Sequence, residues 1–165
     1  MSAPRQYRQT GKLRFCASLA IRVLVMVAAG SVGTAVADPV VTDPRTGVAI
    51  SGFDPVSYFA VRRPEQGKPE FEYAASGIVW YFRNIGNRAA FIDRPDIYGP
   101  QFGGYDPVAV ARGALVPGHP LIWAVDGDRL YLFFDAKARA EFVANPGSFV
   151  ERARLHWPDV QRALP

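Results

Sequence analysis

Few residues in this chain are suited to chemistry: two histidines and two aspartates that occupy the same place in a repeated motif. His119 lies in PGHPL and His156 in LHWPDV, while Asp54 and Asp106 lie in GFDPV and GYDPV. Two imidazoles and one carboxylate are a ligand set for Zn²⁺, Ni²⁺ or Cu²⁺. Asp106, His119 and His156 are therefore the candidate metal ligands. Their spacing does not require a site, and surface histidines are the alternative interpretation.

The repeated pentamer has a structural explanation. Asp is a favoured N-cap, and Pro at the first helical position gives up no hydrogen-bond donor. Asp54 and Asp106 are thus expected to start short helices over 56–60 and 108–112, and an N-cap is worth about 0.5–2 kcal/mol. In the functional interpretation, the glycines before Asp106 let a ligand approach the backbone. The negative charge of the Asp106 carboxylate would favour a cation as this ligand. The candidate ligand-binding residues are Gly103, Gly104, Tyr105, Asp106, Asp54 and Tyr58.

Residues 1–37 predict a secretory signal peptide. They hold five basic and no acidic side chains, and the uncharged stretch 23–37 ends in Ala35-Val36-Ala37, with small residues where signal peptidase reads. Its 15 residues fall short of the roughly 20 that span a bilayer. We expect cleavage after Ala37, a periplasmic or secreted product and no stable membrane anchor. An uncleaved anchor is the alternative.

The composition of residues 38–165 excludes several classes of protein. They hold 14 basic and 15 acidic side chains. The pI near 9.5 of the whole chain therefore comes from its first 37 residues, and the rest has no excess of basic side chains to bind nucleic acid. Cys16, Met1 and Met26 all lie in the signal segment, so the product contains no sulfur. It can form no disulfide, thiolate nucleophile or soft metal site. No haem or iron–sulfur cluster is expected, and the cofactor stays unknown beyond a candidate divalent ion.

The remaining sequence predicts one domain over 47–165, preceded by an extended lead-in over 38–46. Two apolar runs, 71–73 and 78–82, flank AASG and predict a β-hairpin, and the runs 121–125 and 130–134 around Asp-Gly predict a second. A helix is expected after each hairpin, capped by Asn84 or Asp135 and stopped by Pro95 or Pro146. The aromatic residues of these segments are expected mainly in the core.

These two units match each other at an offset of 51 residues. The offset pairs Phe82 with Phe133 and Phe91 with Phe142, and the pentamers precede their units at an offset of 52. The sequence therefore predicts an α+β domain built from two hairpin-helix half-repeats.

The chain resembles the exported bacterial proteins of the YHS-domain type. The resemblance rests on VAISGFDPVSYF, NRAAFIDRPDIYGPQFGGY and LIWAVDGDRLYLFFDAKARAEF, and it covers roughly residues 47–160. It implies a compact α+β domain outside the cytoplasm, and related modules occur in heavy-metal handling proteins. Such proteins commonly carry Cys, sometimes selenocysteine, after GGY, where this chain has Asp106. The aspartate keeps the cap and removes the thiolate, which puts any redox or soft-metal role in doubt.

The expected function is therefore an exported, non-enzymatic YHS-type binding module. Its guest would be a small ligand, a metal ion or a partner protein, held around the Gly103-Gly104-Tyr105-Asp106 segment. The alternative is a hydrolytic or metal-dependent enzyme that uses His119, His156 and Asp106.

Overall fold

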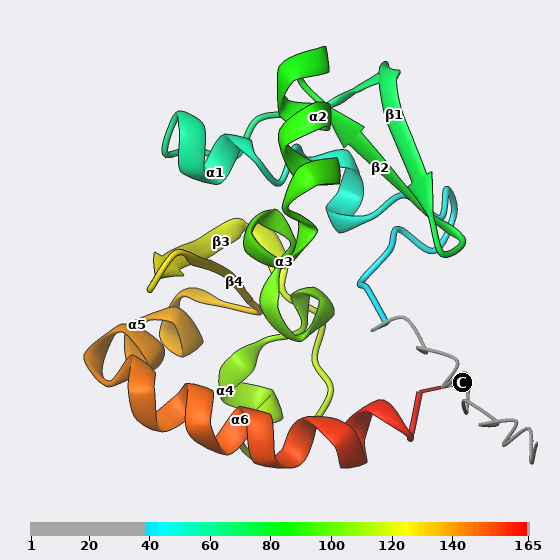
Figure 1. Ribbon diagram of the computed structural model, residues 1–165. Coiled ribbons are helices and arrows are strands. Elements are labelled where there is room, and N and C mark those ends of the chain that lie inside the picture. Colours follow the sequence, from blue (N-terminus) through cyan, green and yellow to red (C-terminus); the bar gives the residue numbers. More distant parts are fainter. Residues whose placement is uncertain (1–38, 165) are drawn as a thin grey trace, which may run out of the picture. The chain divides into compact units, whose positions relative to one another are not determined.

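The computed structural model describes residues 39–164, which all belong to the unit Ala35–Pro165 (Figure 1). The predicted signal peptide, residues 1–37, lies outside the described residues. No helix within 39–164 combines the length and the apolar character needed to cross a membrane. The described chain is a mixed α/β domain with six α-helices and two separate two-stranded antiparallel sheets.

The first of two successive sets of elements surrounds the first hairpin. A 3₁₀ turn, η1 (Ile50–Gly52), and α1 (Ser57–Ala60) precede the strands β1 (Lys68–Ala75) and β2 (Ile78–Phe82). The helices α2 (Ile85–Asp93) and α3 (Pro95–Tyr98) follow them.

The second set has the same order. It runs through η2 (Gln101–Gly104) and α4 (Pro107–Val110) to the strands β3 (His119–Asp126) and β4 (Arg129–Phe133). The helices α5 (Ala136–Ala144) and α6 (Pro146–Gln161) complete it.

Local signals explain the hairpins and the helices that follow them. The two residues of each hairpin turn have left-handed backbones, with φ of 52° and 78° at Ser76 and Gly77, and 54° and 56° at Gly127 and Asp128. This is the backbone of the two-residue turns that match strand twist. The side chains that cap α2 and α5 each accept an N–H three residues on, from Asn87 at 2.9 Å and from Ala138 at 2.7 Å. Both predicted hairpins and both predicted helices are confirmed.

Each hairpin packs its aromatic side chains on the helix that follows it. Phe91 on α2 lies 4.8 Å from Trp80 and 5.2 Å from Phe82, measured between ring centroids. Phe142 on α5 lies 4.8 Å from Tyr131 and 5.2 Å from Phe133. These six side chains are buried, which confirms the expected core position for them. The expectation fits less well for four other aromatic side chains, which are only partly buried: Tyr81, Tyr98, Tyr105 and Trp123.

The C-terminal helix departs from the sequence-based expectation. Pro146 was expected to stop a helix, and it also begins α6, a helix of 16 residues with Pro158 inside it. Pro95 likewise begins α3, which has only four residues. Helix α6 packs against α4 and α5 (Figure 1), with Ala153 buried in the contact. His156 therefore lies on a helix.

Candidate functional site

Asp54 is a buried carboxylate with 0% of its surface exposed. One oxygen accepts the Val56 N–H at 2.8 Å, and the other accepts the Arg83 N–H at 2.8 Å and the Asn87 side-chain amide at 2.5 Å. Asp54 was expected to be the N-cap of a helix from residue 56. Instead α1 begins at Ser57, and Asp54 closes the turn before it. Its carboxylate joins this turn to the end of β2.

Asp106 plays the corresponding part in the second set of elements, with 2% of its surface exposed. It is the N-cap of α4, as predicted, and one oxygen accepts the Val108 and Ala109 N–H groups at 2.8 and 3.3 Å. The other accepts the Phe134 N–H at 2.9 Å, directly after β4. Both pentamers therefore tie a helical start to the end of a hairpin.

The backbone around the two aspartates makes matching hydrogen bonds. The Asp54 N–H donates to the Glu65 carbonyl and the Asp106 N–H to the Val116 carbonyl, both at 2.8 Å. The first glycine of each pentamer is the last of three consecutive residues with positive φ, of 42°, 55° and 79° over residues 50–52, and 53°, 60° and 87° over residues 102–104. The offset of the pentamers is thus also an offset of backbone geometry.

The candidate metal ligands do not come together. His119 is exposed at the start of β3, where its Nδ1 accepts the Leu121 N–H at 3.2 Å. His156 is exposed on α6, near Gly113. Asp106 uses its carboxylate on three backbone N–H groups. Among residues 39–164, no three His, Cys, Asp or Glu side chains form a group that could hold a metal ion, so Asp106, His119 and His156 do not form the expected site.

The candidate ligand-binding residues have varied surroundings. Tyr58 is buried, and its hydroxyl donates to the Pro120 carbonyl at 2.9 Å. Burial, together with the charge of Asp54, raises the pKa of Tyr58 above its usual range. Tyr105 is partly exposed and lies 6.1 Å from Trp157 between ring centroids. These contacts make Tyr58 a core residue.

Gly103 meets the N-terminal lead-in. Its carbonyl accepts the Val41 N–H at 2.8 Å, and a Cβ on Gly103 would lie 1.7 Å from the Pro39 carbonyl oxygen, so only glycine fits here. The lead-in was expected to be extended, but residues 44–46 form a turn, closed where the Asp43 side chain accepts the Arg45 N–H at 2.9 Å. At Gly103, the backbone that was expected to be open to a guest is therefore covered by the lead-in.

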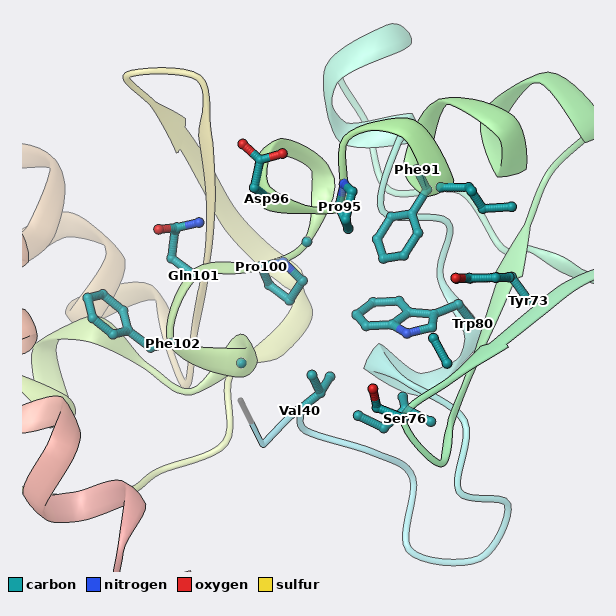
Figure 2. Close-up of a pocket in the computed structure, with 15 residues that line it drawn as sticks. Val40, Tyr73, Ser76, Trp80, Phe91, Pro95, Asp96, Pro100, Gln101 and Phe102 are labelled. Carbon is teal, nitrogen blue, oxygen red and sulfur yellow. The ribbon is translucent and has the colours of Figure 1, made fainter. Parts of the chain in front are cut away.

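The first cavity lies next to the contact between the lead-in and Gly103, and it is lined in part by Val40 and Gly103. Its volume is about 410 Å³. Figure 2 shows the Trp80 and Phe91 rings on its hairpin side, with Pro95 and Pro100 facing them. Val40 and Ser76 lie at one end. Its walls are therefore mainly apolar, and they come from the lead-in, the first hairpin, α2, α3 and η2.

The charged and amide side chains that line the first cavity lie at its margins. In Figure 2 the Asp96 and Gln101 side chains and the Phe102 ring point away from Trp80. Arg94, hydrogen-bonded to Asp96 at 3.2 Å, lowers the pKa of that carboxyl. Sequence reasoning missed this cavity because no local pattern joins Val40, Trp80 and Pro100.

Two further cavities lie in the second set of elements. The second cavity has a volume of about 640 Å³. Many of its lining residues lie 51 positions after residues that line the first cavity. Ala75, Ile78, Trp80 and Pro100 of the first cavity correspond in this way to Asp126, Arg129, Tyr131 and Glu151 of the second. The third cavity, of about 210 Å³, lies between α4 and α5 beside Asp106. The domain thus has an apolar cavity, a charged one and a small one at a buried carboxylate.

Comparisons with protein families, with curated proteins and with solved structures found no match for this chain.

Proposed function

We propose that this protein is an exported YHS-type module that binds a small apolar molecule in the first cavity. The observation that carries the proposal is the aromatic and proline-lined space of about 410 Å³ beside Trp80 and Phe91. Ligand pockets of about 300–1,000 Å³ with mostly apolar walls and a few polar groups are typical of small-molecule sites. Gly103 lines this cavity, so the proposal keeps part of the predicted segment and moves the guest away from Asp106.

The chemistry of the walls selects the ligand. Each Å² of apolar surface, on the guest or on the cavity walls, that binding removes from water contributes roughly 25 cal/mol to the binding free energy. The partly exposed side chains of Tyr73 and Ile78 add contact area, and the Trp80 indole offers an edge to an aromatic guest. A flat apolar molecule with one polar group directed toward Ser76 fits this arrangement best.

The YHS assignment and the export rest on the sequence. The stretches VAISGFDPVSYF and YGPQFGGY support the family, and the basic start with the Ala35-Val36-Ala37 end supports cleavage and export. The absence of sulfur after residue 37 is consistent with a module whose binding does not use redox chemistry.

We also propose that the domain arose from two hairpin-helix half-repeats. The matching carboxylate bonds of Asp54 and Asp106 and the matching left-handed turns support this. So do the strand pairings Lys68 with Phe82 and His119 with Phe133, which lie 51 residues apart in the chain. Even the side-chain bonds of Arg88 to the Glu72 carbonyl and of Arg139 to the Trp123 carbonyl correspond.

The test of ligand binding uses two neighbouring alanines of β1. Ala75 lines the first cavity, while Ala74 is exposed on the other face of the strand. Because successive strand residues point to opposite faces, Ala75→Phe fills the cavity and Ala74→Phe does not. Calorimetric titration of the full chain with indole, para-cresol and benzoate should show saturable binding of at least one probe. That binding should disappear in Ala75→Phe and persist in Ala74→Phe.

Two results would contradict the proposal. One is the absence of saturable binding by a panel of small aromatic and aliphatic probes. The other is equal loss of binding in both phenylalanine variants, because a site in the first cavity must distinguish Ala75 from Ala74.

A further inference from the structure

The surroundings of the third cavity differ from the corresponding part of the first set of elements at two positions beside the aspartate. It is bounded by Asp106, by α4 through Ala109, by Val116 and by α5 through Ala138. Subtracting 52 from the first two positions and 51 from the last two gives Asp54, Ser57, Glu65 and Asn87 as the counterparts. Two alanines in the second set thus replace two polar side chains in the first.

Those two polar side chains complete the hydrogen bonds around Asp54. The Asn87 amide donates to one carboxylate oxygen at 2.5 Å. The Ser57 hydroxyl donates to the Asp54 carbonyl at 2.7 Å and accepts the Glu65 N–H at 3.0 Å. In the first set, therefore, the Asn87 side chain supplies a donor to the buried aspartate, and the Ser57 side chain supplies an acceptor for the Glu65 N–H.

The second set has neither of these two polar side chains. Oδ2 of Asp106 accepts the Phe134 N–H at 2.9 Å, and Ala138 has no amide to add. Ala109 has no hydroxyl to accept the Val116 N–H. In place of the missing groups there is a space of about 210 Å³, several times the roughly 30 Å³ that one water occupies in the liquid.

We propose that the third cavity binds a small primary carboxamide. Its NH₂ group donates to Asp106 Oδ2 as Asn87 donates to Asp54, and its carbonyl oxygen accepts the Val116 N–H as the Ser57 hydroxyl accepts that of Glu65. This site is separate from the first cavity and does not depend on the proposed function.

The hydrogen-bonding groups of the third cavity favour an amide guest over an ion. Arg112 and Glu141, which both line it, form an ion pair of 2.6 Å with each other. Lys137 and Asp135 also line it and carry opposite charges, so the Asp106 carboxylate is the charge that remains. An ammonium guest would offer no acceptor to the Val116 N–H. A carboxylate guest would be repelled by Asp106, so the amide is the class that meets both requirements.

The experiment titrates acetamide into the full chain and follows backbone amide signals by NMR. Saturable shifts should concentrate at Phe134, Ala109 and Val116, and methylammonium and acetate at equal concentration should leave these signals unchanged. Ala138→Asn places in the second set the amide that Asn87 supplies in the first. This variant should raise the melting temperature and weaken acetamide binding at least about tenfold, which corresponds to about 1.4 kcal/mol.

The reciprocal change is the matched control. The double variant Ser57→Ala/Asn87→Ala removes both the acceptor of the Glu65 N–H and the donor to Asp54. It should create an acetamide response at Arg83, the counterpart of Phe134, with the melting temperature partly restored by acetamide. If acetamide shifts no signal in the wild type, the cavity holds water only and the proposal is overturned. It is also overturned if methylammonium binds in place of acetamide, or if Ala138→Asn binds acetamide as well as the wild type.

Discussion

Replacing either pentamer aspartate by alanine should destabilise the domain far more than the loss of a helix cap. An N-cap is worth about 0.5–2 kcal/mol, which is the contribution that the sequence alone predicts. In the structure, Asp54→Ala leaves the Val56 and Arg83 N–H groups and the Asn87 amide without their acceptor. A hydrogen bond to a charged group contributes about 1.5–3 kcal/mol, and a buried unsatisfied donor costs about 1–3 kcal/mol.

The desolvation of the buried carboxylate offsets part of that sum, so we expect about 3–5 kcal/mol for Asp54→Ala. Asp106→Ala should cost less than Asp54→Ala, because one of its three bonds, from Ala109, is long at 3.3 Å. Against the 5–15 kcal/mol by which proteins of this size are usually stable, either change is a large fraction. Urea unfolding of the full chain, followed by far-ultraviolet circular dichroism, measures both.

Asparagine variants separate capping from the bond to the hairpin. Asn caps about as well as Asp, so a residue that only caps should tolerate the change. In Asp106→Asn the amide oxygen can keep the Val108 N–H, but the NH₂ group then faces the Phe134 N–H, donor against donor. We expect Asp106→Asn to lose at least half as much stability as Asp106→Ala. Wild-type stability in Asp106→Asn, or a cost no larger than the roughly 2 kcal/mol upper value of a cap for both alanine variants, would refute this reasoning.

Three further predictions follow from the packing, the buried tyrosine and the leader. Phe91→Ala and Phe142→Ala should each cost about 3–5 kcal/mol in urea unfolding, since both rings are buried at corresponding positions; costs that differ severalfold would argue against equivalence. Because the raised pKa of Tyr58 keeps its phenol protonated in the fold while the unfolded chain ionises, stability should fall as the pH rises above about 10. Tyr58→Phe should make that fall shallower, although it loses the bond to Pro120 at neutral pH, and an unchanged alkaline slope would contradict this. Intact-mass measurement of the exported protein should find a chain that starts at Asp38, and a product that retains Met26 would exclude cleavage there.

The elements that could be predicted are those whose causes are local. The AASG and Asp126-Gly127-Asp128 segments mark the two hairpins, because residues 76–77 and 127–128 adopt positive φ and the strands on either side contain β-branched or aromatic residues. In the second hairpin the turn residues are Gly127 and Asp128, one place after the Asp-Gly pair. The helices after them start at Asn84 and Asp135, whose side chains accept an N–H three residues away. In each case the signal and the structure lie within a few residues of each other.

Pro146 shows where local reasoning was ambiguous. A proline lacks an N–H and has a fixed φ, so the same residue can end one helix and occupy the first turn of the next. The sequence was interpreted only in the first sense, and the 16-residue helix α6 was missed. What stabilises α6 is its packing, through Ala153 and Val160, on Val110 and Ala111 of the α4 region, more than 40 residues earlier. No pattern within α6 states that partner.

The candidate sites were harder to predict. Residues that are the same in the two halves indicate what the fold needs, whereas the residues that line the cavities are often those that differ between the halves. The sequence drew attention to Asp54 and Asp106 because they recur, and the structure gives both the same backbone-bridging role. Recurrence therefore marked what the fold requires twice. The differences between halves, Trp80 against Tyr131, Ile78 against Arg129 and Asn87 against Ala138, lie at cavity walls or beside the buried carboxylates. If the halves are related as proposed, each such difference was free to change without loss of the shared framework, and the cavities are where binding could be acquired by one half alone.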